Sequence, residues 1–445
     1  MHRRSFVSDM ARAGVAAAVL PNVGFAARAR SRSDAINIAC IGVGGMGFQD
    51  VRNFGAVPDV NIYALCDVDQ KAATEAYGLF PKAKRYRDYR EMLVKEGSSI
   101  DAVTISTPDH SHAAAAIMAL KAGKHVYCQK PLARTLGEVR AIIAASKNAK
   151  GSTQMGNQGH AGEGVRLIRE YVEGGLIGTV REVHFWTDRP IWPQGIDRPT
   201  EAHNAPPTLD WDLWLGPAQA RPYHPAYAPF RWRGWWDFGT GAMGDMACHA
   251  MDAAFWVLGL RYPSRVEVET STAFPETAPR ASRVTYYFPA AQGRPEVKLV
   301  WRDGGLWPAR PNEVSSEMRW PPSNDGGQLW LGDSGKLVAG VYAENPRLLN
   351  EEQNAAIKAK PLPVKYERVK SVHVEWIDAC RAGKQAGSNF AGHAGPLTEM
   401  IALGNLAVRA GRTLELDAAT GVVKSPTIPN DWIMPAYRSG YTLAV

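Results

Sequence analysis

Three residues have types and spacing suited to proton transfer: Lys130, Asp245 and His249. Asp245 and His249 are four apart in a helical pattern that follows the glycines of GTGAMG, so both side chains point from one helix face. Lys130 ends an apolar run, which is where ligands bind in open α/β sheets. A histidine exchanges its proton near neutral pH. On the residues alone, a solvated lysine and a hydrogen-bonded core histidine remain alternatives.

The Asp-x-x-x-His pair could also ligate a metal ion. A metal centre needs at least a third ligand, and no third residue stands at a suitable spacing. No metal site is therefore expected.

A glycine-rich loop predicts a dinucleotide site. The apolar run AINIACIGVG leads into Gly42, Gly44, Gly45, Met46 and Gly47, and Asp67 ends the next run, twenty residues after Gly47. Gly42 permits the tight turn, Gly44 lets the backbone approach a pyrophosphate, and Gly47 lets helix and strand pack closely. Asp67 is expected to bind the ribose 2′-hydroxyl and to repel a 2′-phosphate, which favours NAD over NADP. A doubly wound domain without nucleotide is the alternative.

The elements that position this loop alternate between apolar runs and helical stretches. VNIYALCD, DAVTISTP and HVYCQKP follow the first run, with helical patterns such as SHAAAAIMALKAGK between them. This βαβαβ order predicts a Rossmann fold, a doubly wound parallel sheet, over residues 34–150. The cofactor residues expected at its later strand ends are Thr107, Pro108, His112, Gln129 and Lys130.

Residues 151–445 predict a second, α+β domain. GVRLIREYVEGG has one apolar helical face, whereas VREVHFWTD, RVEVETSTAF, RVTYYF and EVKLVW alternate like half-buried strands. No long helices separate the last three, which predicts an open, mostly antiparallel sheet. Residues 371–412 are predicted helices that pack back near the first domain. An uncovered sheet face favours self-association, so a homo-oligomer, a dimer or tetramer, is expected.

Three separated segments resemble those of the Gfo/Idh/MocA oxidoreductases, the glucose-fructose oxidoreductase and inositol dehydrogenase-like family. STPDHSHAAAAIMALKAGKHVYCQKPLA is similar to the stretch that ends in the family's Glu-Lys-Pro motif, and WWDFGTGAMGDMACHAMD is similar to its second active-site segment. GPLTEMIALGNLAVRAG extends the similarity to the C-terminal part. Gln129 stands where the family usually has glutamate. Because that glutamate is not the family's proton carrier, the change is expected to alter orientation or cofactor contacts rather than reaction type.

The resemblance implies that Lys130, Asp245 and His249 meet at the nicotinamide. His249 would take the proton from a substrate hydroxyl while hydride leaves the same carbon. Lys130 would stabilise the developing alkoxide, and Asp245 would hold the substrate or the imidazole. The predicted activity is an NAD(P)-dependent oxidoreductase acting on CH–OH groups.

The tryptophans narrow the substrate class. Eight of the 14 lie between Trp186 and Trp256, beside the predicted catalytic helix. Tryptophan faces pack against sugar C–H surfaces while polar neighbours bind hydroxyls, which favours a sugar or polyol, although core packing uses the same residues. The expected substrate residues are Asn157, Gln158, His160, Trp235, Trp236 and Asp245.

The N-terminus predicts export. Arg3 and Arg4 precede a short Ala/Val/Leu region and an Ala-Arg-Ala exit, which is typical of a twin-arginine signal over residues 1–33 and a periplasmic location. An untidy basic N-terminus is the alternative.

The charge and cysteine content exclude several classes of partner and fold. Residues 1–30 hold five arginines and one aspartate, so the formal charge of +7 falls to +3 beyond them. No basic block interleaved with aromatics is present, so nucleic acid is not an expected partner. The apolar region is too short for a membrane span. The odd cysteine count of 5 argues against a disulfide framework.

An exported enzyme cannot exchange nicotinamide nucleotide with a cytoplasmic pool, so a tightly bound NAD, recycled in place, is expected. One route is a ping-pong oxidoreductase that uses two sugars. Another is an NAD-dependent glycosidase, in which oxidation of a ring hydroxyl permits elimination of the aglycone before water adds and hydride returns. A non-catalytic sugar-binding protein is a third hypothesis.

Overall fold

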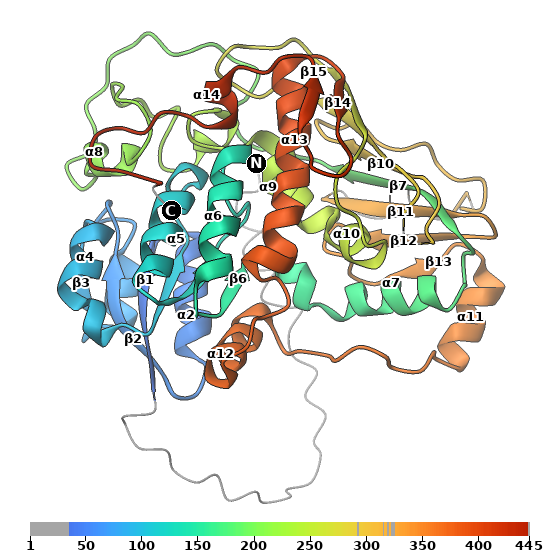
Figure 1. Ribbon diagram of the computed structural model, residues 1–445, viewed down its shortest axis with the longest axis horizontal. Coiled ribbons are helices and arrows are strands. Elements are labelled where there is room, and N and C mark those ends of the chain that lie inside the picture. Colours follow the sequence, from blue (N-terminus) through green and yellow to red (C-terminus); the bar gives the residue numbers. More distant parts are fainter. Residues whose placement is uncertain (1–34, 292, 315, 318–319, 322–324, 444–445) are drawn as a thin grey trace, which may run out of the picture. The chain divides into compact units, whose positions relative to one another are not determined.

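The computed structural model describes residues 35–443 apart from 292, 315, 318–319 and 322–324 (Figure 1). The predicted signal segment, residues 1–33, lies outside the described residues. From Ile36 onward the chain forms one compact unit.

A six-stranded, wholly parallel sheet forms the N-terminal half of this unit. In the order β3-β2-β1-β4-β5-β6, its strands are β1 (Ile36–Ile41), β2 (Val60–Cys66), β3 (Lys84–Tyr86), β4 (Ala102–Ile105), β5 (His125–Cys128) and β6 (Thr153–Met155). The central strands are buried because helices cover both faces, which explains their unbroken apolar runs. β6 lies beyond residue 150, so the sheet extends past the predicted domain boundary.

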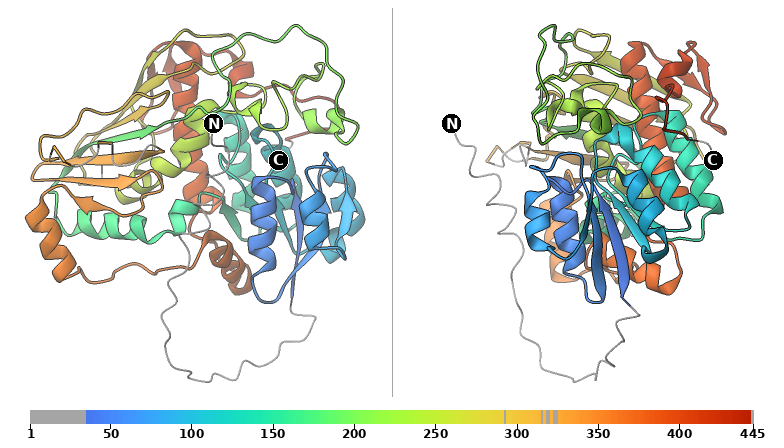
Figure 2. Two further views of the ribbon diagram at one scale, coloured as in Figure 1. Left: turned by 180° about the vertical axis from the view of Figure 1, so that it is seen from behind. Right: turned by 90° about the vertical axis from the view of Figure 1, so that its left-hand side faces the viewer.

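Helices fill the connections of this sheet: α2 (Met46–Gly55), α3 (Thr74–Leu79), α4 (Tyr89–Glu96), α5 (His112–Lys121) and α6 (Leu136–Asn148). α5 and α6 share a core with β4 and β5, whereas α2 shares another with α12 (Val372–Ala382) on the opposite face (Figure 2). α6 begins at a capping box in which Thr135 and Glu138 satisfy each other's backbone N–H groups. The sheet is therefore covered on both sides by segments that include a helix from the far end of the chain.

The second half contains a nine-stranded sheet. In the order β13-β12-β11-β7-β10-β9-β8-β14-β15, its strands are β7 (Val180–Thr187), β8 (Arg265–Thr270), β9 (Ser282–Phe288), β10 (Val297–Arg302), β11 (Gly326–Gly332), β12 (Lys336–Gly340), β13 (Arg347–Leu348), β14 (Leu414–Leu416) and β15 (Val423–Ser425). β7 and β10 pair in parallel, and every other neighbouring pair is antiparallel. The predicted fold class is confirmed.

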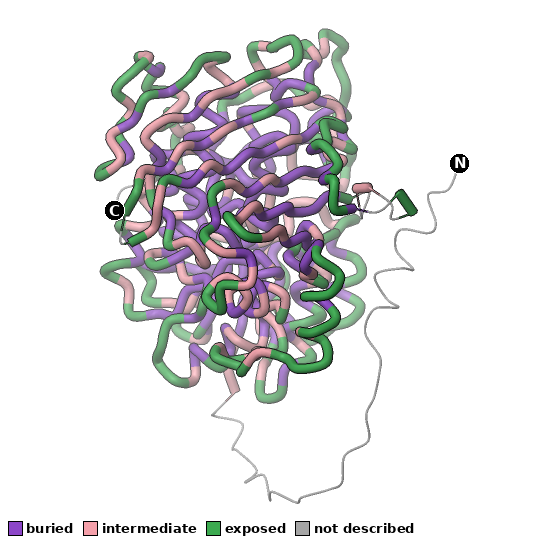
Figure 3. Tube along the Cα trace, turned by 90° about the vertical axis from the view of Figure 1, so that its right-hand side faces the viewer, coloured by how far each residue is buried: buried purple, intermediate pink, exposed green. Residues whose placement is uncertain are grey.

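Helices pack on one face of this second sheet. The helices of this half are α7 (Glu163–Glu173), α8 (Trp211–Leu215), α9 (Gly241–Ala250), α10 (Asp252–Val257), α11 (Glu351–Ala359), α13 (Gly395–Ala410) and α14 (Asn430–Ile433). α13 packs against α6, α9 and β8, so it joins the two halves through a single apolar core. Buried residues run through the interior, and exposed ones lie mainly on loops and outer helices (Figure 3). Within the described residues, the helices are too short or too polar to cross a membrane.

Candidate active site

The glycine loop joins β1 to the N-terminus of α2. Gly45 has φ 55°, and no atom lies within 4 Å of the position that a Cβ would occupy there. At Gly47 a Cβ would lie 2.0 Å from the Gly42 backbone oxygen, so this contact requires glycine. No described side chain caps α2, so the N-terminus of this helix is available to a phosphate. The loop therefore fits the pyrophosphate of a dinucleotide.

The open position in this loop is Gly45 rather than Gly44. A Cβ at Gly44 would lie 2.8 Å from the Cβ of Ala72, so Gly44 is pressed against protein. Met46, the next residue after Gly45, is exposed. A phosphate would therefore approach the loop from the side of Gly45 and Met46.

Asp67 follows β2 and lies directly beside the loop. Its Oδ2 accepts hydrogen bonds from the backbone N–H groups of Val43 at 2.8 Å and Gly44 at 3.2 Å, and its Oδ1 accepts from Asp69 N at 2.9 Å. Burial raises the pKa of Asp67, although these N–H groups oppose the shift. An acidic side chain here disfavours a 2′-phosphate, as predicted for NAD. The same carboxylate also holds the loop in shape.

Thr107, Pro108 and His112 lie where β4 ends. Thr107 and Pro108 are partly exposed at this edge. His112 is fully buried, and its ring nitrogens lie 2.8 Å from Pro131 O and 2.9 Å from Thr107 O. His112 therefore ties the ends of β4 and β5 together and does not face open space, unlike its two neighbours.

Gln129 is buried beneath the loop. Its Nε2 donates to Asp50 Oδ2 at 2.9 Å, and Asp50 also accepts from Ser106 Oγ at 2.8 Å and from His373 Nε2 at 2.9 Å. The prediction of a cofactor contact at Gln129 is therefore not supported by this geometry, because its amide faces α2. The network also explains why position 129 carries an amide. A glutamate there would place a second carboxylate next to that of Asp50, and the two negative charges would repel each other.

Lys130 and Asp245 form a partly buried ion pair at the carboxyl end of the parallel sheet. Lys130 Nζ donates to Asp245 Oδ1 at 2.8 Å and to the Asp245 backbone oxygen at 2.9 Å, and Arg233 Nε lies 3.4 Å from the same carboxylate. Burial by itself would raise the pKa of Asp245, but the charges of Lys130 and Arg233 hold it well below its usual range. The pair brings β5 and α9 together as predicted.

His249 lies one helical turn after Asp245 on α9 and is 4% exposed. Burial, and then the positive charge of Lys130, lower its pKa to about 3, so the imidazole is neutral. Its Nδ1 has no hydrogen-bond partner among the described residues. A neutral imidazole with an unused nitrogen beside a lysine can accept a proton from a hydroxyl.

Tyr342 is a site residue that sequence reasoning missed. It comes from the turn after β12, and its ring centroid lies 4.7 Å from that of His249. The turn holds two non-glycine residues in the left-handed region, Ala343 at φ 63° and Asn345 at φ 50°. Tyr342 is 38% exposed, so part of the ring is free to meet a ligand. No motif marks this turn, because its position depends on the second sheet.

Asp109 is a second missed residue. It is buried, accepts a hydrogen bond of 2.8 Å from Thr240 Oγ1, and interacts electrostatically with Lys130 and Asp245. Burial raises its pKa to about 7. Asp109 directly follows Thr107-Pro108 near the carboxyl end of a strand, where ligands bind in such sheets, and this position could have identified it from the sequence.

The predicted substrate residues are mostly engaged with protein. Trp235 is fully buried and donates to Ala226 O at 2.9 Å, and Trp236 is 8% exposed within the main core. These two tryptophans therefore pack in the protein interior and do not face a ligand. This is the alternative, core packing, that the sequence left open. Asn157 and His160 hydrogen-bond Asp252, and Gln158 is partly exposed.

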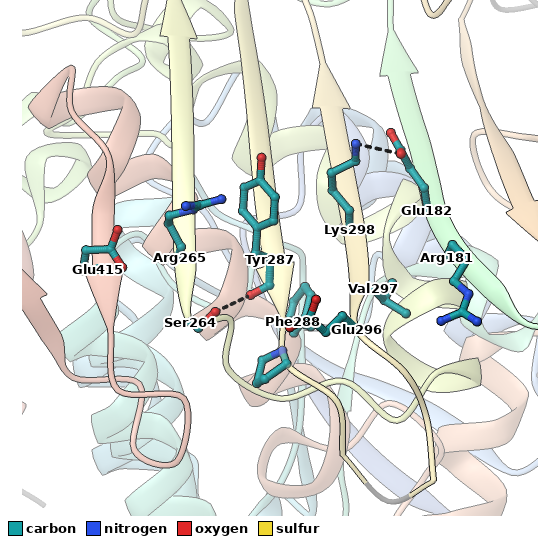
Figure 4. Close-up of a pocket in the computed structure, with 11 residues that line it drawn as sticks. Arg181, Glu182, Ser264, Arg265, Tyr287, Phe288, Glu296, Val297, Lys298 and Glu415 are labelled. Atoms are coloured by element: carbon teal, nitrogen blue, oxygen red, sulfur yellow. Dashed lines mark hydrogen bonds and ion pairs between the residues drawn. The ribbon is translucent and has the colours of Figure 1, made fainter.

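A cleft of about 460 Å³ lies elsewhere, on the open face of the second sheet (Figure 4). Its lining comes from β7, β8, β9, β10 and β14 and their ends, and includes Arg181, Arg265, Tyr287 and Lys298. None of the predicted catalytic residues lines it. The cleft is therefore separate from the predicted catalytic residues at the edge of the parallel sheet.

Comparisons with known proteins identify the family of the chain. The model of an oxidoreductase family with an NAD-binding Rossmann fold matches residues 36–157, and the model of that family's C-terminal alpha/beta domain matches residues 162–293. Together they cover more than half of the chain. They meet close to the end of β6, where the parallel sheet ends.

Two curated relatives and one solved structure illustrate the range of similar proteins. Inositol 2-dehydrogenase of Salmonella typhimurium is 31% identical over 149 residues, 32% of this chain and 43% of the relative. Alpha-N-acetylgalactosaminidase of Shewanella oneidensis is 31% identical over 156 residues, 33% of this chain and 34% of the relative. The chain thus spans less than half the length of these relatives.

The solved structure of a levoglucosan dehydrogenase in complex with NADH superposes with a TM-score of 0.58 at 19% identity, covering 86% of this chain and 99% of that one. At this identity the likeness concerns the fold. With the family models matching both halves, the chain belongs to the Gfo/Idh/MocA family of oxidoreductases, which have an NAD-binding Rossmann fold.

Proposed function

We propose that this protein is an NAD-dependent oxidoreductase that transfers hydride between a tightly bound cofactor and a hydroxyl-bearing carbon of a sugar or polyol. The observation that carries the proposal is the partly buried Lys130–Asp245 ion pair with neutral His249 one turn away, at the carboxyl end of an NAD-binding fold. Bound NAD would supply the hydride acceptor. NADP is disfavoured by Asp67.

The side chains divide the proton chemistry among them. His249 accepts the hydroxyl proton, since its neutral form persists across the physiological pH range. The Lys130 ammonium stabilises the negative charge that develops on the substrate oxygen. Asp245 accepts from Lys130 through both its carboxylate and its backbone oxygen, so it fixes the direction of the ammonium.

A polyhydroxylated substrate suits the rim of this site. Tyr342 offers an aromatic face, and Arg233 offers a guanidinium that stacks on Trp232 with 4.3 Å between its carbon and the ring centroid. The similarity to an inositol dehydrogenase and a levoglucosan dehydrogenase also supports a sugar-like substrate.

The direct test incubates the purified protein with single sugars and polyols and follows the absorbance of the bound nicotinamide. A sugar that reduces the cofactor, and a second that restores it, would support the proposal. If free sugars leave the absorbance unchanged while the protein holds NAD, the oxidoreductase assignment is wrong.

A redox-neutral glycosidase is the second candidate, favoured by the similarity to an alpha-N-acetylgalactosaminidase. It would use the same three residues with no net change in the cofactor. Release of the aglycone from aryl glycosides, with NAD content constant before and after, would support it. Intact glycosides together with sugar-dependent reduction would exclude it.

Export is part of the proposal. We infer a twin-arginine signal in residues 1–33 and a periplasmic location from Arg3, Arg4 and the apolar region that follows them. Fractionation of the native host, comparing the wild-type chain with an Arg3→Lys/Arg4→Lys variant, tests this: retention of only the variant in the cytoplasm is expected. Equal distribution of both chains would contradict it.

Self-association is proposed through the open face of the second sheet. The residues around its cleft mix both signs: Arg181, Arg265 and Lys298 with Glu182 and Glu415 (Figure 4). Such a face can complement a second copy across a two-fold axis. Light scattering of the wild type and of an Arg265→Glu/Lys298→Glu variant tests this: the variant is expected to shift towards monomer, and a monomeric wild type would contradict the proposal.

A further inference from the structure

Two imidazoles and one carboxylate meet in the interior, separate from the predicted catalytic residues. His160 Nδ1 lies 2.9 Å from Asp252 Oδ2, and His393 Nε2 lies 2.6 Å from Asp252 Oδ1. The three candidate ligand atoms all lie within 4.8 Å of one another. The residues are 4%, 1% and 6% exposed, respectively.

Three irregular points of the chain present these groups. His160 lies on η4 (Gln158–Ala161), a 3₁₀ turn, and Asp252 is the first residue of α10. His393 lies on η6 (Phe390–Ala394), a π-helical turn that precedes α13. π-helical turns are rare and occur frequently at functional sites. The local geometry around His393 therefore supports a specific role for its side chain.

A second layer of hydrogen bonds orients the carboxylate. Asn157 Nδ2 donates to Asp252 Oδ1 at 2.8 Å, and Ser388 Oγ donates to Asn157 Oδ1 at 2.7 Å. Metal-binding carboxylates are commonly held by such outer partners. Asn157 and Ser388 are both fully buried, so the arrangement is shielded from water.

The nearby arginine does not occupy this site. Arg166 donates to the backbone oxygens of His160, Gly162 and Glu367, and none of its hydrogen bonds goes to Asp252. The remaining donor set, two nitrogens and one carboxylate, matches the preferences of zinc and neighbouring divalent ions.

We propose that His160, Asp252 and His393 bind one divalent first-row transition ion, such as Zn²⁺. At ligand distances of about 2.0–2.1 Å in a tetrahedron, neighbouring ligand atoms lie roughly 3.3 Å apart, so each of the two histidine–Asp252 contacts needs to lengthen by less than about 1 Å. Bound metal would lock the start of α10 to η4 and η6. Because His249 precedes Asp252 by three residues, the ion would also steady the end of α9.

The test uses the full-length protein and measures metal rather than turnover. The purified chain is analysed for metals, stripped with a chelator and titrated with Co²⁺, whose visible absorption reports low-coordinate nitrogen ligation. About one ion per chain is expected. His393→Gln, which keeps a donor to Asp252, should weaken Co²⁺ binding at least about 10-fold.

A matched control separates this site from adventitious binding. His203→Gln removes an exposed histidine whose ring lies 4.6 Å from that of His224, and it should bind Co²⁺ like the wild type. X-ray absorption of the Zn²⁺-loaded wild type, which needs no variant to fold, should show two imidazole ligands. The proposal is overturned by any of three results: no metal in the purified chain together with no Co²⁺ spectrum, equal Co²⁺ binding by His393→Gln and the wild type, or an X-ray absorption spectrum without imidazole ligands. Each would leave a purely hydrogen-bonded cluster.

Discussion

Gln129 and Asp50 are joined by a hydrogen bond of 2.9 Å between the amide Nε2 and a carboxylate oxygen, both side chains being buried. Asp50 lies on α2, directly beyond the glycine loop, and it also accepts from Ser106 and His373. The residue before Lys130 is thus connected to the helix that follows the glycine loop. Where the family usually has glutamate, this chain has the amide of Gln129, which can donate a hydrogen bond to the carboxylate of Asp50.

Gln129→Glu is therefore expected to destabilise the fold. It places two carboxylates in one buried site, and the loss should be about 3 kcal/mol in the free energy of unfolding, measured by urea denaturation near neutral pH. Gln129→Glu combined with Asp50→Asn restores one acid and one amide and should recover most of the loss. Equal stability of the single variant and the wild type would show that the pairing is unimportant.

His249→Ala should lower kcat by roughly 10²–10⁴-fold, because the proton acceptor is lost. NAD content after extensive dialysis should stay unchanged, since the loop and Asp67 are far from this helix in sequence and form their own contacts. The measurement combines turnover with mass spectrometry of the released nucleotide. Turnover that survives the substitution would remove His249 from the mechanism.

The pH dependence of stability should also report His249. Its pKa falls from 6.5 to about 3 on folding, so between these values the unfolded chain binds more protons than the native one. The contribution of His249 to stability therefore decreases as pH falls through 6.5 towards 3, and no such loss exists above 6.5. His249→Gln should gain stability relative to the wild type at about pH 5 compared with about pH 8. Parallel curves for the two proteins would contradict a buried neutral imidazole.

Tyr342→Ala should raise KM more than it lowers kcat, because it removes an aromatic surface beside His249 without removing a proton carrier. Tyr342→Phe keeps the ring, so a KM close to that of the wild type would assign the effect to the ring face. Steady-state kinetics of both variants with the same sugar separate the contribution of the aromatic ring from that of the hydroxyl group. An unchanged KM in Tyr342→Ala would show that substrate does not reach this turn.

Asp67→Ala should weaken NAD binding and narrow the preference for NAD over NADP, because the acid no longer repels a 2′-phosphate. Titration of nucleotide-free protein with both cofactors measures the ratio. Asp67→Asn is the matched variant: it removes the charge but retains an acceptor for the Val43 and Gly44 amides. A ratio unchanged in both variants would place the ribose elsewhere.

The sequence by itself determined the parallel sheet, its glycine loop and the shared helix face of Asp245 and His249, because these features depend on local periodicity, turn chemistry and strand ends. That Lys130 meets this helix was expected only from the family resemblance, since the two segments lie 115 residues apart. Strands β3, β6 and β11–β15 were not predicted, since pairing partners rather than local pattern stabilise them.

Only the tertiary structure decided which side chains surround these groups. Trp235 and Trp236 share a motif with the catalytic helix but lie in the core, whereas Tyr342 reaches His249 from a turn almost a hundred residues later. His393 meets Asp252 across 141 positions, and Gln129 meets His373 through Asp50. Contacts between distant segments follow from how helices and sheets pack, and no spacing along the chain encodes them.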